Sequence, residues 1–433
     1  MEQSITHEIT LLVLQLAFVI FIARIFGEIF ERFLKQPAVL GELIAGVLFG
    51  PYLLGAWIIF PGIGPLFPLL SPDSLEAQSH IPVSLSLYGI AQIASIVLLF
   101  VAGLETNLAH FLRFAGKASV VGGAGILLPF FLGAVTTVWF GFADSFFDGP
   151  ALFMGAIMAA TSVGITARVL GDINKVDTPE GITILGAAVV DDVLGILVLA
   201  IIVNLAQSGT LDLGKVSWIA LKAIGIWLGV SAFFILLAPR LVRTWSWFQG
   251  SGSALILTFF ACLLAAVLCE LVGLAMIIGA YSVGLAFSNT PIAQKLVDEL
   301  RGVYHLFVPV FFVALGMLVN LDTISAALIF GLVISLFAIL GKIIGCGIAG
   351  LGCGFNLVGA YRIGVGMVPR GEVALIIAGY GLARGVVTPD MFGVAILMTL
   401  VTTVLAPIFL VPAFRNQKSG LRMVPVPLKQ NSG

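Results

Sequence analysis

The chain has 433 residues, of which 60% are hydrophobic and only 10% are charged. This composition excludes a water-soluble globular protein, because a soluble core could not hide so much apolar surface. The net charge of −1 and the lack of a basic patch exclude a protein that binds nucleic acid by neutralising its phosphates.

Apolar runs recur from end to end, and a run of about 18 residues or more can cross a bilayer as a helix. Thirteen spans are predicted: 11–33, 37–53, 84–105, 115–142, 150–170, 182–206, 216–239, 254–271, 274–287, 303–318, 324–353, 363–382 and 391–414. We therefore expect an all-α polytopic membrane protein, with a transmembrane domain over residues 1–415 and a short tail over residues 416–433.

Positive charges predict the orientation. They gather in alternate connections and in the tail: Arg32, Lys35, Arg113, Lys117, Arg168, Lys175, Arg240, Arg243, Lys295, Arg301, Arg415, Lys418, Arg422 and Lys429. Such connections face the cytoplasm, so we expect the N-terminus outside and the C-terminus inside an energised membrane such as the bacterial inner membrane.

The first span lacks the features of a cleaved signal peptide. The four cysteines form neither a disulfide framework nor a zinc pattern, and no cofactor is expected.

Two pairs of segments in opposite halves of the chain resemble each other. LLFVAGLETNL at 98–108 resembles FFVALGMLVNL at 311–321, and IAGVLF at 44–49 resembles SVGLAF at 282–287. The two copies lie seven predicted helices apart, so they would cross the membrane in opposite directions. Inverted repeats of this kind are typical of transporters, although helices rich in glycine, leucine and alanine also resemble each other by composition alone.

The strongest signal for function is the pair Asp191 and Asp192 in the middle of a predicted span. Carboxylates at this depth cost several kcal/mol each unless they are protonated, paired or turned toward a cavity, and for this reason they usually mark a functional site. Such a pair can hold either a proton or a hard cation that prefers oxygen ligands. The structural alternative is a pair of aspartates that joins helices through salt bridges.

Two predicted helices contain residues that break a helix. Thr161 and Ser162 interrupt the fifth span, and in the corresponding helix of the second half Pro369 and Gly371 flank Arg370, with Glu372 adding a second charge. Unwound backbone exposes carbonyl oxygens and helix ends that can complete a cation site. We expect Thr161, Ser162 and the two aspartates to form the ion site, with Asp192, Asp191 and Thr161 as Na⁺ ligands. Arg370 and Glu372 would compensate charge at the second break.

Lys342 is the only charge in the eleventh span. Its ammonium group needs a carboxylate partner, for which Asp191 or Asp192 is the natural candidate; the alternative is a lysine that reaches the cytoplasmic surface. Glu42, Glu105 and Glu270 lie near predicted interfaces, where solvated or capping roles are favoured over transport. The four histidines are interpreted as ordinary surface residues.

Seven motifs in order along the chain carry a family resemblance: QPAVLGELIAGVLFGP, VLLFVAGLETNL, TSVGITARVL, VVDDVLGILVLAI, IIGAYSVGLAF, VFFVALGMLVNL and VPRGEVALII. With them the chain resembles the second large family of monovalent cation:proton antiporters, which includes bacterial sodium/proton antiporters and glutathione-gated potassium efflux systems.

The resemblance implies a membrane homodimer of thirteen-helix protomers. Dimer-domain helices would span about 9–106 and 252–319, core-domain helices about 115–207 and 324–414, and a linker helix about 216–239. The broken helices would cross near the aspartates, with Asp192 as the ion carrier. Asp191 together with a lysine like Lys342 resembles the electrogenic type of the family.

The expected function is the exchange of Na⁺, with Li⁺ as a further substrate, for H⁺ by alternating access. Potassium efflux members of the family usually carry a cytosolic nucleotide-binding domain after the last helix, and its lack here favours sodium. A K⁺/H⁺ antiporter with the same site is the alternative. An intramembrane aspartyl protease also needs two membrane carboxylates, but on separate helices in YD and GxGD contexts that do not occur here. A passive channel is a further alternative. A carrier differs from a channel because its flux is obligatorily coupled to protons.

Overall fold

The computed structural model describes residues 2–68, 83–208, 213–245, 247–248, 250, 252–319, 328–415 and 418–422. This part of the chain is almost entirely helical, which confirms the predicted all-α class. The strands found in it form one short antiparallel hairpin, β1 (Ile59–Phe60) and β2 (Gly64–Pro65).

The helices follow one another along the chain. In order they are α1 (Glu2–Ile29), the π-helical turn Phe30–Leu34, α2 (Ala38–Phe49), the 3-10 turn Leu54–Trp57, α4 (Leu85–Glu105), α5 (Leu108–Trp139), α6 (Gly149–Ala159), α7 (Val163–Asp172), α8 (Pro179–Ser208), α9 (Leu213–Trp245), α10 (Ser253–Glu270), α11 (Met276–Ser288), α12 (Ala293–Met317), α13 (Leu328–Gly352), α14 (Leu357–Gly366), α15 (Glu372–Ala383) and α16 (Pro389–Arg415).

Ten segments among the described residues are long and apolar enough to cross a membrane, and three further apolar helices are shorter: Ala38–Phe49, Met276–Ser288 and Val373–Leu382. The count of thirteen spans stays a prediction. Helix starts differ most from the predicted spans where polar residues extend a helix beyond its apolar run. The helix α12 begins at Ala293 rather than 303, because its first turns are amphipathic and carry an exposed ion pair of Arg301 with Asp298.

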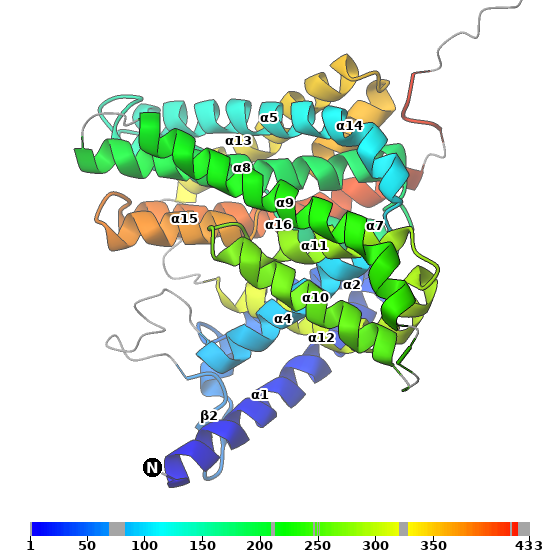
Figure 1. Ribbon diagram of the computed structural model, residues 1–433. Helices are drawn as coiled ribbons and strands as arrows, with labels where there is room; N and C mark the ends of the chain where they lie inside the picture. Colours follow the sequence, from blue (N-terminus) through cyan, green and yellow to red (C-terminus); the bar gives the residue numbers. More distant parts are fainter. Residues whose placement is uncertain are drawn as a thin grey trace, which may run out of the picture.

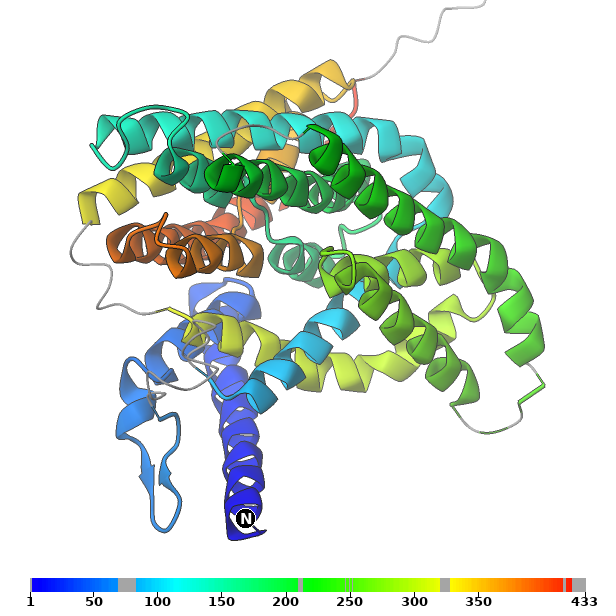
Figure 2. The ribbon, with the colours of Figure 1, turned by 60° about the vertical axis from the view of Figure 1, so that its left-hand side comes forward.

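The helices form two bundles. Figure 1 shows α5, α8, α13, α15 and α16 in the upper half of the molecule and α1, α4, α10 and α12 in the lower half, and the second view agrees (Figure 2). Within the upper bundle α5 packs on α8 and α13, and within the lower bundle α4 packs on α11 and α12. The helix α9 packs on α8, α10 and α11 and so contacts both bundles.

The predicted repeats meet crosswise in the lower bundle. A Cβ atom on Gly46 of α2 would lie 2.9 Å from the Cα of Gly316 in α12, and a Cβ on Gly103 of α4 would lie 2.9 Å from the Cα of Gly284 in α11. The segment 44–49 of the first copy therefore contacts the described part of the second copy's segment, 311–319, and 282–287 of the second contacts 98–108 of the first. Residues 320 and 321 of the predicted repeat lie outside the described residues. Glycine at these four positions allows the helix backbones to approach closely. Two inverted copies of one unit would pack against each other in this reciprocal way.

Candidate functional site

Two broken helices cross at the centre of the molecule. The first break covers residues 160–162 between α6 and α7, and the second covers residues 367–371 between α14 and α15. The Ser162 amide donates a hydrogen bond to the Pro369 carbonyl at 2.8 Å, and the Thr166 hydroxyl donates one to the Gly366 carbonyl at 2.7 Å. Both breaks therefore occur at the residues that the sequence analysis selected. Donor groups at the first break form hydrogen bonds with carbonyl groups at the second.

Close approach at the crossing depends on Gly371. A Cβ atom at this position would lie 2.6 Å from Ser162 Oγ and 2.8 Å from Ser162 Cβ, so a larger residue could not be placed there without movement. Ser162 and its neighbour Thr161 are each only 2% exposed. Among the described residues neither hydroxyl has a hydrogen-bond partner, and buried polar atoms without partners indicate a site for water or an ion.

Arg370 lies fully buried in the second break. Its guanidinium group donates to the carbonyls of Val368 at 2.5 Å, Met158 at 2.7 Å, Ala338 at 3.2 Å and Met367 at 3.3 Å. Met158 belongs to the last turn of α6, whose free carbonyls carry the negative end of the helix dipole. Arg370 is therefore positioned to stabilise both breaks.

The backbone of Arg370 is held by α16: the Arg370 amide donates to Thr402 Oγ1 at 3.3 Å and the Thr403 hydroxyl donates to the Arg370 carbonyl at 2.6 Å. Glu372 begins α15, and its side chain lies outside the described residues.

The two aspartates of α8 are buried and differ in their surroundings. Asp191 is 1% exposed, and its Oδ1 lies 3.0 Å from Nζ of Lys342, which has no exposed surface. The expected ion pair is thus present with Asp191, and the alternative of a lysine that reaches the cytoplasmic surface is wrong. Gly125 of α5 provides room, since a Cβ there would lie 2.7 Å from the Cys346 sulfur and 3.4 Å from the lysine nitrogen.

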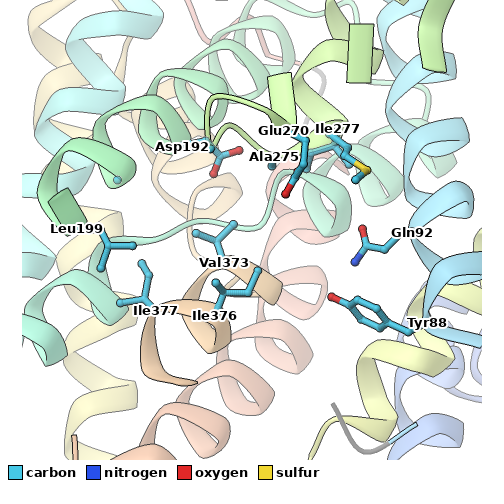
Figure 3. A pocket seen from close by; sticks show the side chains of 13 residues that line it. Tyr88, Gln92, Asp192, Leu199, Glu270, Ala275, Ile277, Val373, Ile376 and Ile377 are labelled. Atoms are coloured by element: carbon cyan, nitrogen blue, oxygen red, sulfur yellow. The ribbon is translucent and has the colours of Figure 1, made fainter. Parts of the chain in front are cut away.

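Asp192 lines a cavity of about 310 Å³ between the two bundles. The carboxyl group lies on the cavity wall in Figure 3, and the residue is 5% exposed. The lining residues are Tyr88, Gln92, Asp192, Gly195, Leu199, Glu270, Gly273, Ala275, Met276, Ile277, Val373, Ile376 and Ile377. Successive helical residues point about 100° apart, which explains why Asp191 can reach the lysine while Asp192 faces the cavity.

A buried charge cluster was missed by the sequence analysis. Glu42 of α2 is 3% exposed and Arg168 of α7 is 6% exposed, and Arg168 Nη2 lies 3.6 Å from Glu42 Oε1. Arg168 Nε also donates to Asp172 at 3.1 Å, and its guanidinium carbon lies 5.2 Å from the centre of the Tyr304 ring. The interpretation of Glu42 as a solvated or capping residue and of Arg168 as a charge in a connection was therefore wrong. The available signal was an arginine inside the predicted span 150–170.

Comparisons with known proteins agree with this architecture. The sequence model described as "Sodium/hydrogen exchanger, transmembrane" matches residues 17–416. The chain is 35% identical over 94% of its length to the high-affinity Na⁺/H⁺ antiporter NhaS3 of Synechocystis, of which it covers 90%. It is also 35% identical over 91% of its length to the Na⁺/H⁺-K⁺ antiporter GerN of Bacillus cereus, of which it covers 94%.

The fold resembles the sodium proton antiporter MjNhaP1 of Methanocaldococcus jannaschii with a TM-score of 0.68, at 16% identity, over 94% of this chain and 99% of that one. The match to the family covers nearly the whole described transmembrane part, including both broken helices and the two aspartates. The chain therefore belongs to the sodium/hydrogen exchanger family of transmembrane transporters.

Proposed function

We propose that this protein is a secondary active antiporter that exchanges Na⁺ for H⁺ at Asp192. The observation that carries the proposal is the position of this carboxyl group on the wall of a cavity between two bundles. The antiporters NhaS3 and GerN support the choice of ions, since both names include Na⁺ and H⁺. The family is one of transporters, so the alternative of an intramembrane aspartyl protease is wrong and no cofactor is required.

Exchange follows from competition for one charge. A bare carboxylate in low-dielectric surroundings is costly, so the site changes its exposure from one side of the membrane to the other only when H⁺ or Na⁺ neutralises it. The hydroxyls of Thr161 and Ser162 and the carbonyls of the two breaks would supply further oxygen ligands, which a hard cation prefers. No covalent step is involved.

Asp191 and Lys342 make the exchange electrogenic in this proposal. When Na⁺ is bound by both aspartates, Lys342 loses its partner and releases its proton, so two protons move for each Na⁺. One net charge then crosses the membrane in each cycle, which is worth about 2.3 kcal/mol per 100 mV. A membrane potential negative inside would help drive sodium out.

Proton movement in proteoliposomes, followed with a pH-sensitive dye, tests the assignment. Asp192→Asn should abolish exchange, whereas Asp144→Asn, which alters an exposed aspartate that does not line the cavity, should leave it unchanged. An Asp192→Asn variant that still exchanges Na⁺ for H⁺ would refute the carrier role. A flux through the wild type that is not coupled to protons would indicate a channel instead.

A K⁺/H⁺ antiporter is the second candidate, because the name of GerN includes K⁺. Oxygen-lined sites distinguish Na⁺ from K⁺ by cavity size and ligand number. Dye measurements against Na⁺, Li⁺ and K⁺ gradients would decide between them, and we expect Na⁺ and Li⁺ to give the larger responses.

The two bundles would have different roles in transport. We infer that the upper bundle, residues 115–207 and 324–414, moves as a core domain, while the lower bundle, residues 9–106 and 252–319, forms a homodimer interface and α9 links them.

The positive charges favour an N-terminus outside a bacterial inner membrane. Single cysteines at Glu8 and Ser419 and a membrane-impermeant thiol reagent would test the orientation, since only Glu8→Cys should react in intact cells.

A further inference from the structure

A second carboxyl group lines the cavity of Asp192. Glu270 is the last residue of α10 in the lower bundle, whereas Asp192 belongs to α8 in the upper bundle. In Figure 3, Glu270 lies between Asp192 and the polar side chains of Gln92 and Tyr88. Asp192 is nearly covered and Glu270 is exposed, and from this difference we infer that the cavity opens at Glu270 and closes at Asp192.

The backbone holds Glu270 at this position. The Glu270 carbonyl accepts a hydrogen bond from the Gly273 amide at 2.8 Å, and the Cys269 carbonyl accepts one from the Leu274 amide at 3.0 Å. Gly273 has a φ of +84°, a conformation that favours glycine and ends the helix. The turn that follows supplies Gly273, Ala275 and Met276 to the cavity wall. Glu270 is thus fixed at the opening by the same turn that forms part of the wall.

The charge of the cavity has one sign. Among its lining residues the charged ones are Asp192 and Glu270, no lysine or arginine is among them, and the uncharged polar side chains are Tyr88 and Gln92. The remaining lining residues are apolar or glycine. A cleft with walls of low dielectric constant and charges of one sign concentrates the field and attracts counter-ions.

We propose that the negative charge of Glu270 attracts the transported cation into this cavity, on the side of the membrane where the cavity opens. The proposal rests on the proposed exchange at Asp192. Glu270 belongs to the opposite bundle from Asp192, so its charge acts on the cation before binding and does not travel with the site. Its effect is therefore confined to one side of the membrane and to the concentration dependence of transport.

The test measures Na⁺-driven proton movement with Na⁺ offered from each side, using cells without their own antiporters and inverted membrane vesicles from the same cells. For Glu270→Gln we expect the apparent KM for Na⁺ to rise about five-fold on the side where α10 ends, the size expected of one unit charge acting over a partly screened path. The KM on the other side and the maximal rate should stay unchanged. Raising the ionic strength with choline chloride to about 0.5 M should reduce the difference, because screening shortens the reach of the charge.

A charge series separates this role from a structural one. Glu270→Asp keeps the negative charge and should therefore keep the apparent KM for Na⁺ close to that of the wild type. Glu270→Lys should raise this KM beyond the value for Glu270→Gln. The matched control is Glu8→Gln on the exposed start of α1, which should leave KM unchanged. Equal KM changes on both sides, a change that ignores charge and ionic strength, or no change in KM would each overturn the proposal. Failure of the wild type to exchange Na⁺ for H⁺ would instead refute the proposed function, so the two failures can be told apart.

Discussion

Nζ of Lys342 lies 3.0 Å from Oδ1 of Asp191, and neither side chain has more than 1% of its surface exposed. A buried pair of this kind contributes little net stability when both charges are present, because removal from water offsets the attraction. Loss of one partner is far more costly, since the other charge stays buried and unpaired. The pair is therefore suited to a process in which the charge of one partner is cancelled by an incoming ion.

Replacement of Lys342 by glutamine should affect stability and electrogenicity together. We expect the free energy of unfolding to fall by about 3–5 kcal/mol, seen as a lower midpoint of thermal unfolding in detergent. The double variant Lys342→Gln with Asp191→Asn should recover most of this loss. Any exchange that remains in Lys342→Gln should be insensitive to membrane potential in proteoliposomes, and undiminished sensitivity would contradict the charge count of two protons per Na⁺.

Competition at Asp192 predicts the pH dependence of transport. Protons and Na⁺ exclude each other, so a rise in pH removes the competitor and lowers the apparent KM for Na⁺. On the acidic side of the transition the change should be about tenfold per pH unit for each competing proton. The maximal rate at saturating Na⁺ should stay nearly constant, and initial rates over a matrix of pH and Na⁺ would show it. A falling maximal rate with an unchanged KM would point to regulation away from the site.

The ion pair of Glu42 with Arg168 joins α2 in the lower bundle to α7 beside the crossing, with both side chains buried. Glu42→Gln should therefore leave Arg168 with a charge that Asp172 alone compensates, and we expect a loss of about 3 kcal/mol in the free energy of unfolding. The matched control is Glu28→Gln, which breaks the exposed pair with Arg24 on α1 at 2.9 Å and should change stability little. Similar unfolding midpoints for the two variants would show that the buried pair is already solvated.

The sequence could predict those features that depend on local chemistry. Long apolar runs predicted the helices, and the polar and helix-breaking residues Thr161, Ser162, Pro369 and Gly371 predicted the breaks, because unwinding is a property of the segment itself. The partner of Lys342 was narrowed to two adjacent aspartates but not to one, since their directions depend on how α8 packs.

Features that depend on how helices meet could not be predicted in this way. Glu42 and Arg168 lie more than a hundred residues apart and each is near the end of its predicted span, so single-sequence patterns indicated a surface charge at both positions. The cavity position of Glu270 likewise requires α4, α8, α10 and α15 to be brought together, which no local pattern reports.

The contact of Gly371 with Ser162 provides a sharp test of the crossed breaks. In Gly371→Ala the new methyl group would meet Ser162 at its Cβ as well as its Oγ, so rotation of the hydroxyl cannot relieve the contact and the backbone of one break must move. Overpacking of this kind costs about 1–3 kcal/mol. We expect a lower unfolding midpoint together with a raised apparent KM for Na⁺, because displaced hydroxyl and carbonyl oxygens would no longer fit the ion. Gly123→Ala on α5, where a Cβ would meet nothing within 4 Å, is the control and should be neutral or slightly stabilising. If the two alanine variants behaved alike in stability and in KM, the two breaks could not be in such close contact in the working protein.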